Sequence, residues 1–85
     1  MYRLIFTDRA LKSLKALQKR EAGKIIAQLE ELADSPQSKA NVKCLQNHPR
    51  AVFRLRVGDY RVLFNKYNEF EVLEIIDVGH RKEIY

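Results

Sequence analysis

Arginines gather on both sides of one short turn in the second half of the chain. Residues 50–61 contain four arginines around the pair Gly58-Asp59, which favours a tight turn. Side chains two residues apart in a strand share a face, so we expect Arg54 and Arg56 to project together. An arginine side chain stays charged and presents a planar set of donors that fits phosphate oxygens. The spacing therefore predicts a site for a polyanion on one face of a small sheet.

A second basic group follows in the C-terminal segment, residues 78–85. This segment contains His80, Arg81 and Lys82 and ends with Tyr85. Arginine stabilises charge on a phosphate, tyrosine can stack on a base, and histidine exchanges a proton near neutral pH. The segment therefore strengthens the interpretation as a nucleic-acid site.

A plainer interpretation of the arginines is open too. In it, Arg54 and Arg56 lie on an ordinary solvated strand face. They would then form surface ion pairs with nearby glutamates, Glu71 and Glu74. We favour the site, because Arg61 and the C-terminal segment add cations that such pairing does not explain.

Length and composition indicate one small globular domain, residues 1–85. The chain is 46% apolar and has a formal net charge of +5, from 16 basic and 11 acidic side chains, which suits an acidic partner. The apolar runs are too short for a membrane span and the start lacks a signal peptide, so we expect a cytoplasmic protein without membrane contact. Cys44 has no second cysteine to pair with. Because Cys44, His48 and His80 lack metal-ligand spacing, we expect no metal and no cofactor.

Hydrophobic periodicity predicts the elements that must carry these residues. We expect a strand at residues 2–6 and a helix that starts at Thr7-Asp8. A break at residues 20–23 separates it from a second helix, which ends before Pro36. The apolar stripes of the two helices are Ala10, Leu11, Leu14 and Leu17, then Ile25, Ile26, Leu29, Leu32 and Ala33.

The rest of the chain predicts a loop and three strands. Residues 35–49 hold turn-forming residues and are expected to cross back to the sheet as a loop. Strands are expected at residues 51–57, 60–66 and 70–78, the last apolar on both faces as an interior strand is. The class is α+β: an N-terminal strand, a two-helix hairpin and a three-stranded antiparallel meander, forming one sheet with helices on one face. We expect the other face to be uncovered and to carry the arginines.

Two motifs together resemble the RelE/ParE superfamily of toxins from type II toxin–antitoxin modules. The first is Phe53-Arg-Leu-Arg-Val-Gly-Asp-Tyr-Arg61-Val-Leu-Phe, and the second is Val78-Gly-His-Arg-Lys-Glu-Ile-Tyr85. The resemblance covers essentially the whole chain, including the helical hairpin. It implies a RelE-like fold and a cognate antitoxin that wraps over the toxin in a hetero-oligomer.

The resemblance implies one of two activities. RelE-like members cleave messenger RNA in the ribosomal A site, without a metal, and so inhibit translation. ParE-like members inhibit DNA gyrase. RelE-type activity depends on basic residues in the first motif strand, an arginine after the turn, an arginine in the C-terminal segment and a terminal tyrosine. The matching positions hold Arg54 with Arg56, then Arg61, Arg81 and Tyr85, which favours the nuclease branch and makes the ribosome and messenger RNA partners.

The nuclease hypothesis gives each residue a role. Arg54 and Arg61 hold the scissile phosphate and stabilise its added charge, while Arg81 orients the leaving oxygen or donates to it. Tyr85 stacks on a base or accepts the proton of the 2′-hydroxyl. Further contacts to the RNA are expected from the other basic side chains, Arg50, Arg56, His80 and Lys82.

The proton acceptor is the open point of this hypothesis. RelE-like enzymes often carry lysines where this chain has Val52 and Arg54, and an arginine does not release its proton. Either Tyr85 or His80 takes the role, or the chain relies on positioning by the ribosome. A noncatalytic module that only binds nucleic acid or antitoxin is a third hypothesis, beside the nuclease and the gyrase inhibitor.

Overall fold

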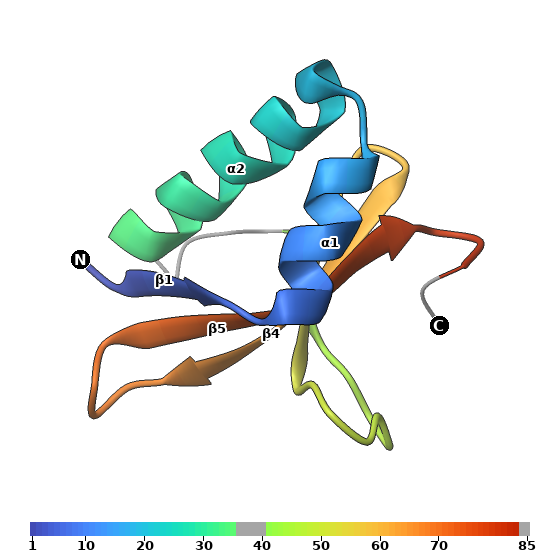
Figure 1. Ribbon diagram of the computed structural model, residues 1–85. Coiled ribbons are helices and arrows are strands. Elements are labelled where there is room, and N and C mark those ends of the chain that lie inside the picture. The colour runs from blue at the N-terminus through green and yellow to red at the C-terminus, as the bar shows by residue number, and fades with distance from the viewer. Residues whose placement is uncertain (36–40, 84–85) are drawn as a thin grey trace.

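A computed structural model of the chain describes residues 1–35 and 41–83 and shows two helices on one side of a single sheet (Figure 1). No helix in this described part is long and apolar enough to cross a bilayer. The elements in chain order are β1 (Arg3–Phe6), α1 (Asp8–Ala16), α2 (Lys19–Asp34), β2 (Val42–Cys44), β3 (Phe53–Val57), β4 (Tyr60–Tyr67) and β5 (Val72–His80).

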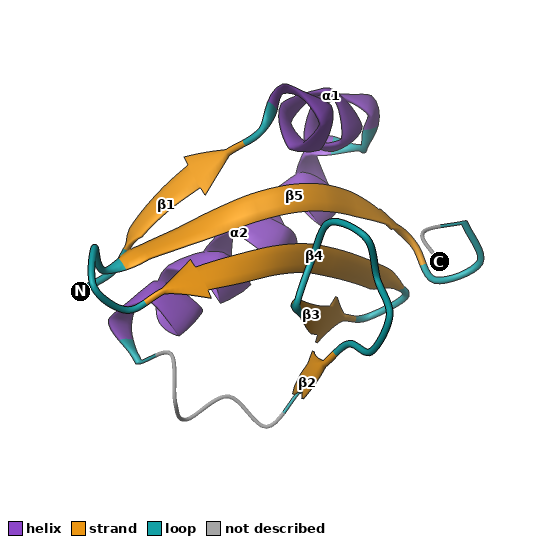
Figure 2. Cartoon of the chain, turned by 90° about the horizontal axis from the view of Figure 1, so that it is seen from below, coloured by secondary structure: helices purple, strands orange, loops and turns teal. Residues whose placement is uncertain are grey.

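The sheet has five strands in the order β1-β5-β4-β3-β2 (Figure 2). β1 pairs with β5 in parallel, and the other neighbours are antiparallel. The α+β class, the antiparallel meander and the interior place of β5 are confirmed. The expected loop at residues 35–49 is wrong in one respect, because Val42–Cys44 forms the edge strand β2. A strand of three residues is too short to show an alternating pattern in the sequence.

The start of α1 follows the sequence prediction, but the break between the helices does not. The Thr7 hydroxyl accepts a hydrogen bond from the Ala10 amide at 3.1 Å and so caps α1. The break lies at Leu17 and Gln18, which have extended backbone, and Gly23 lies inside α2. Leu17 is partly buried and packs against the core, while Gly23 is accommodated inside α2 despite the weak helix propensity of glycine. The predicted end of α2 is confirmed at Asp34.

The main core lies between the helices and the sheet. Leu11 was expected in this core, but it is 40% exposed, because α1 turns Ala10 and Leu14 inward instead. Buried residues from both layers form the cluster: Ala10, Leu14, Ile25, Leu29, Leu32, Ala33, Leu55, Val62, Phe64, Leu73, Ile75 and Val78. The apolar positions of β3 alternate with its arginines, so Phe53, Leu55 and Val57 face the helices and the arginines face the other side.

The face of the sheet opposite the helices, here called the outer face, is partly covered. Residues 45–52, here called the cap, cross it on the way from β2 to β3 (Figure 2). Two residues of the cap, Ala51 and Leu45, pack on Leu63 and Ile76 of the sheet and form a second small cluster with them. The expectation of an uncovered face is therefore wrong over this area. Ala51 precedes β3 and packs on this side, opposite to Phe53, which packs on the main core.

The third predicted strand starts two residues later than expected. Phe70 and Glu71 lie in the turn before β5, where Phe70 is 71% exposed and Glu71 has a positive φ of 51°. An irregularity in the β4–β5 pairing sets Leu63 opposite Asp77 and Phe64 opposite Ile75. The extra residue, Ile76, turns toward the cap, so this bulge supplies part of the second cluster.

Candidate nucleic-acid interface

Two arginines lie directly opposite each other on neighbouring strands of the outer face. The β3–β4 register pairs Arg56 with Arg61, two positions before and after the turn at Gly58-Asp59. Gly58 has a φ of 58°, so the predicted tight turn is confirmed. Like charges in direct cross-strand contact destabilise a sheet. The pair is therefore poorly explained by stability and well explained by an anion bound between the two side chains.

Arg54 lies beside this pair, on the same strand and face as Arg56. Its cross-strand neighbour on β4 is the buried Leu63. The Nε atom of Arg54 is buried and has no hydrogen-bond partner among the described residues. An unpaired buried donor is costly, and a phosphate oxygen would supply the missing acceptor.

Lys43 is a further cation of this group, which the sequence pattern did not indicate. On its other side β3 pairs with β2, and the register sets Lys43 opposite Arg54. Side chains of directly opposed residues share a face, so a lysine joins the arginine row. The available signal was the three-residue alternation of Val42, Lys43 and Cys44, which is too short to reveal a strand.

The side chain of Arg61 is held in place by the turn. Its Nη1 atom donates to the carbonyl oxygens of Gly58 and Tyr60, at 3.1 and 3.0 Å. Its neighbour on β5 is Gly79, which has no side chain to crowd it. Arg61 is thus oriented before any ligand binds, which is what charge stabilisation in a transition state requires.

The segment after β5 folds back onto the same turn. The Arg81 amide donates to the Asp59 carbonyl at 2.8 Å, and its Nε lies 4.0 Å from the Asp59 carboxylate. Both side chains are exposed, so this ion pair is weak and Arg81 is free to exchange it for a phosphate. Lys82 is exposed as well, and Tyr85 lies outside the described residues.

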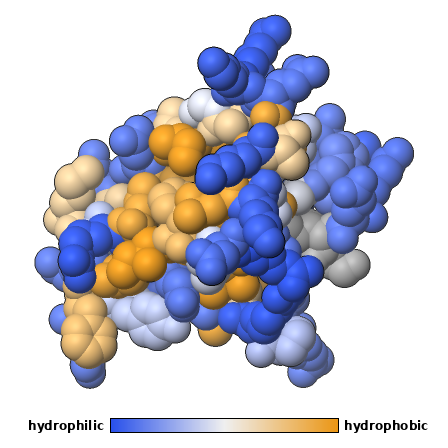
Figure 3. All heavy atoms as spheres, viewed as in Figure 1, coloured by the Kyte–Doolittle hydropathy of each residue, from blue (hydrophilic) through white to orange (hydrophobic). Residues whose placement is uncertain are grey.

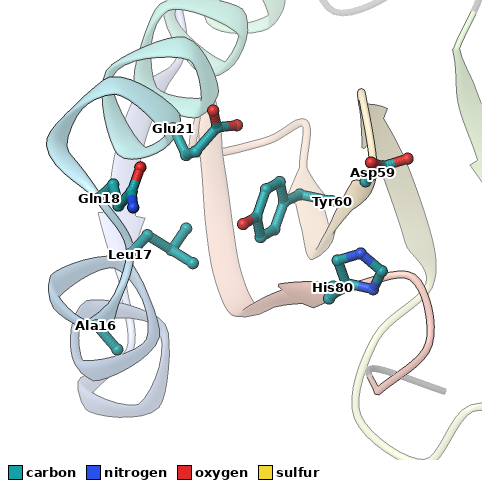
Figure 4. Close-up of a pocket in the computed structure, with 7 residues that line it drawn as sticks. All are labelled: Ala16, Leu17, Gln18, Glu21, Asp59, Tyr60 and His80. Carbon is teal, nitrogen blue, oxygen red and sulfur yellow. The ribbon is translucent and has the colours of Figure 1, made fainter.

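His80 lies on the other side of the sheet from the arginines. The register pairs it with Tyr60, and the two rings meet edge to face with centroids 5.8 Å apart. Both residues line an open hollow of about 440 Å³, together with Leu17 of the helix connection and Glu21 of α2 (Figure 4). The structure therefore does not bring His80 together with Arg54, Arg56 and Arg61 (the strand arginines).

Arg50 lies in the cap rather than on a strand. Its side chain is exposed, while its amide donates to the Nδ1 atom of His48 at 3.1 Å. Its carbonyl accepts from the Nδ2 atom of Asn65 at 3.0 Å. Arg50 is thus placed at the rim of the outer face by bonds that the sequence did not indicate.

The acids expected to neutralise the strand arginines lie elsewhere. β5 is not next to β3, so Glu71 and Glu74 cannot pair across strands with Arg54 and Arg56. Glu74 instead accepts a hydrogen bond from the Tyr67 hydroxyl at 3.0 Å, and this bond raises the pKa of Tyr67 above its ordinary value, with a smaller contribution from burial. Within residues 1–35 and 41–83, the strand arginines form no ion pair. The expected ion pairs of Arg54 and Arg56 with Glu71 and Glu74 are therefore wrong.

Cations dominate this face, and metal-ligating groups do not gather in the described part of the chain. There, no three His, Cys, Asp or Glu side chains are placed to hold a metal ion. What the site offers is a row of charged donors, Arg54, Arg56 and Arg61, with Lys43 and Arg81 at its borders. Such a row can bind a phosphate backbone and stabilise negative charge on it.

Comparison with known proteins adds a family and a fold. Residues 4–85 match the ParE toxin family of the type II toxin–antitoxin system parDE. The structure is similar to a chain of the intact E. coli RelBE toxin–antitoxin complex, with a TM-score of 0.76, 28% identity, and coverage of 94% of this chain and 96% of that chain. A chain of the RelBE2 toxin–antitoxin complex of Mycobacterium tuberculosis is similar with a TM-score of 0.80 and 27% identity, and the match covers 94% of this chain and 98% of that chain. A mutant E. coli RelE toxin bound to a peptide of its antitoxin is similar with a TM-score of 0.72 and 31% identity, and the match covers 93% of this chain and 82% of that chain. No curated protein sequence matches significantly.

Proposed function

Since this chain belongs to the ParE toxin family, within the RelE/ParE superfamily, we propose that it is a ribosome-dependent endoribonuclease that cleaves messenger RNA in the A site. That the chain is a toxin of a type II toxin–antitoxin module follows from the family itself. One observation carries the finer proposal. Arg56 and Arg61 face each other beside Arg54, and no acid of the described residues neutralises them.

The proposed chemistry is cleavage of the RNA by its own 2′-hydroxyl. The 2′-oxygen bonds to phosphorus, the bond to the 5′-oxygen breaks, one proton leaves the hydroxyl and one is taken up by the leaving oxygen. Arg54 and Arg61 hold the phosphate and stabilise its added negative charge. Arg56 and Arg50 hold the neighbouring backbone, and Arg81 with Lys82 lies on the side of the leaving group.

Lys43 is our candidate for the proton acceptor. The strand arginines keep their protons, whereas an amine can release one and take one up. Lys43 is opposite Arg54, which places an amine at the border of the phosphate site. Tyr85 stays a second candidate for the same step. His80 does not, because it lies on the helix side of the sheet.

An antitoxin is the second partner that we propose. Solved relatives include RelE bound to RelB, and similar wrapping suits this chain. Apolar residues gather where α1, α2 and β1 meet, with hydrophilic residues around them (Figure 3). Leu11 of α1 is 40% exposed, so an amphipathic segment of a partner has an apolar side chain to cover on the helix side. The complex would then be a hetero-oligomer, formed in the cytoplasm where ribosomes are.

Gyrase inhibition is a second candidate function, because the matching family takes its name from ParE. The arginine face would then be a binding surface for protein or DNA and would carry no chemistry. The two functions give different products in the cell, since one cuts messenger RNA on ribosomes and the other leaves DNA breaks.

Toeprinting of messenger RNA on translating ribosomes tests the proposal directly. Purified protein should produce cuts within the codon in the A site, and Arg61→Ala prepared in the same way should not. Intact messenger RNA, together with DNA breaks and an SOS response after induction, would favour the gyrase inhibitor and remove the nuclease.

A further inference from the structure

One side chain fastens the cap to the sheet. Asn65, on β4, accepts a hydrogen bond from the Val52 amide at 2.7 Å through Oδ1. Through Nδ2 it donates to the Arg50 carbonyl at 3.0 Å. Asn65 therefore satisfies two backbone groups of the cap that would otherwise face water.

The cap itself is a compact unit. Its two ends are joined by a bond from the Leu45 amide to the Val52 carbonyl, at 2.6 Å. The His48 Nδ1 atom accepts from the amides of Arg50 and Ala51, both at 3.1 Å. Ala51 is 4% exposed and packs on the second cluster, so the cap rests on the outer face by an apolar contact.

This contact leads to Arg54. Leu63, which lies under Ala51, is the cross-strand neighbour of Arg54. Arg54 also follows Val52, the end of the cap, by only two residues. The Nε atom of Arg54 is buried, whereas the neighbouring Arg56 is exposed. This difference is consistent with the cap covering the site on the side of Arg54.

We infer that Asn65 is a positioning residue of the arginine site: by tying the cap to β4 it fixes the orientation of Arg54. Asn65 acts through the cap and makes no contact with RNA. This inference rests on the proposed function for its catalytic consequence. Its structural consequence, an ordered Arg54 guanidinium, stands without it.

Loss of the Asn65 amide should free the cap without unfolding the domain. Val52 and Arg50 would bond to water instead, and only the apolar contacts of Ala51 and Leu45 would hold the cap on the outer face. Arg54 would then sample several rotamers, and a shift of about 1 Å in a phosphate-binding group can lower a rate about 100-fold.

Asn68 offers a matched control on the same hairpin. It is an exposed asparagine in the turn between β4 and β5, and its Oδ1 accepts from the Tyr2 hydroxyl at 2.7 Å. Asn68→Ala removes the same amide group, three residues away. A structural loss common to any asparagine of this hairpin would therefore affect Asn65→Ala and Asn68→Ala alike.

The first measurement follows the Arg54 Nε–H signal by NMR in the isolated toxin. Its hydrogen exchange should be slow in the wild type and in Asn68→Ala, and faster by about 10-fold or more in Asn65→Ala. Equal exchange in all three proteins would overturn the inference. This readout needs no activity, so it judges Asn65 even if the nuclease proposal fails.

The second measurement is A-site cleavage, with thermal unfolding measured in parallel. Asn65→Ala should lower kcat by about 10- to 100-fold and change KM by less than about 3-fold. Unchanged kcat, or a loss equal to that of Asn68→Ala, would contradict a positioning role. If the wild type cleaves nothing, the proposed function fails, and the exchange measurement alone decides on Asn65.

A milder variant covers the case in which Asn65→Ala does not fold. Asn65→Asp keeps an acceptor for the Val52 amide but replaces the donor to the Arg50 carbonyl with an oxygen. Its control, Asn68→Asp, adds the same charge at the tip of the hairpin. Faster Arg54 Nε–H exchange in Asn65→Asp than in Asn68→Asp supports the inference, and equal exchange rejects it.

Discussion

The two faces of this sheet are built by different physics. The helix side is closed by apolar packing, with Leu55, Val62, Leu73 and Ile75 fully buried. The outer face combines unneutralised cations with a small apolar cluster, and directional hydrogen bonds hold its cap. Adjacent residues of β3 divide between the two, since Leu55 points to one face and Arg56 to the other.

This difference separates what stabilises the domain from what it can bind. Apolar burial is the main source of folding free energy, and most of it is on the helix side. The paired arginines oppose folding locally, because Arg56 and Arg61 repel each other. Substitutions on the helix side should therefore change stability, and substitutions on the outer face should change activity. Four predictions test that division.

The largest effect is expected on the helix side, from Leu55→Ala. Leu55 is fully buried, so its truncation should lower the free energy of unfolding by about 2 to 5 kcal/mol. Urea unfolding at low temperature measures the change. Cleavage per folded molecule should be preserved, and a stability loss under about 1 kcal/mol would break the comparison.

Arg61→Ala should do the reverse. Removal of a preorganised donor should lower cleavage about 100- to 1,000-fold. Stability should change by less than about 0.5 kcal/mol, because a surface charge that faces Arg56 is lost. Single-turnover cleavage and thermal unfolding measure the two effects. A variant that keeps full toxicity would contradict a catalytic role for Arg61.

Lys43 sharpens the comparison within the outer face. If it accepts the proton, Lys43→Arg should lower the rate about 100-fold although the positive charge is kept. A pH–rate profile of both proteins makes the test, since the variant should lose one ionisation from the profile. An unchanged profile would assign the proton transfer to Tyr85 or to the ribosome.

The smallest effect concerns the exposed pair of Tyr67 and Glu74. The raised pKa of Tyr67 means that this bond stabilises the fold below pH ~10, the ordinary tyrosine pKa, and is lost as pH rises through the higher folded value. Wild-type stability should therefore fall more steeply above pH ~10 than that of Tyr67→Phe, by about 0.5 kcal/mol or less because solvent screens the pair. Urea unfolding from pH 8 to 11 checks this, and parallel curves would contradict it.

The sequence predicted the helix side well, because apolar alternation and helical periodicity are local signals of burial. Leu14, Ile25, Leu29 and Leu55 are in the core as expected. Leu11 is not, because which turn of α1 meets the sheet depends on the angle of packing. The helix break was misplaced as well: it lies at Leu17 and Gln18, before the predicted residues 20–23, and Leu17 packs against the core.

The outer face was predicted only in part. Its strand arginines follow from the spacing of two, and their convergence at the turn was expected. The cap, β2 and the side-chain bonds of Asn65 depend on contacts distant along the chain, which no local pattern encodes. His80 was grouped with Arg81 by sequence, yet β5 ends at His80, and the register places its ring on the helix side while Arg81 lies in the turn that follows.

The parallel pairing of β1 with β5 has a consequence for when the toxin can form. Arg3 is the register partner of Val72, so the edge of the sheet closes across almost the whole described chain. During synthesis β1 and both helices emerge long before β5, and they have no central strands to pack on. The β3–β4 hairpin, which carries the strand arginines, likewise has no β5 to pair with until β5 has been synthesised. The arginine face is therefore complete only after the last strand along the chain has been translated and released.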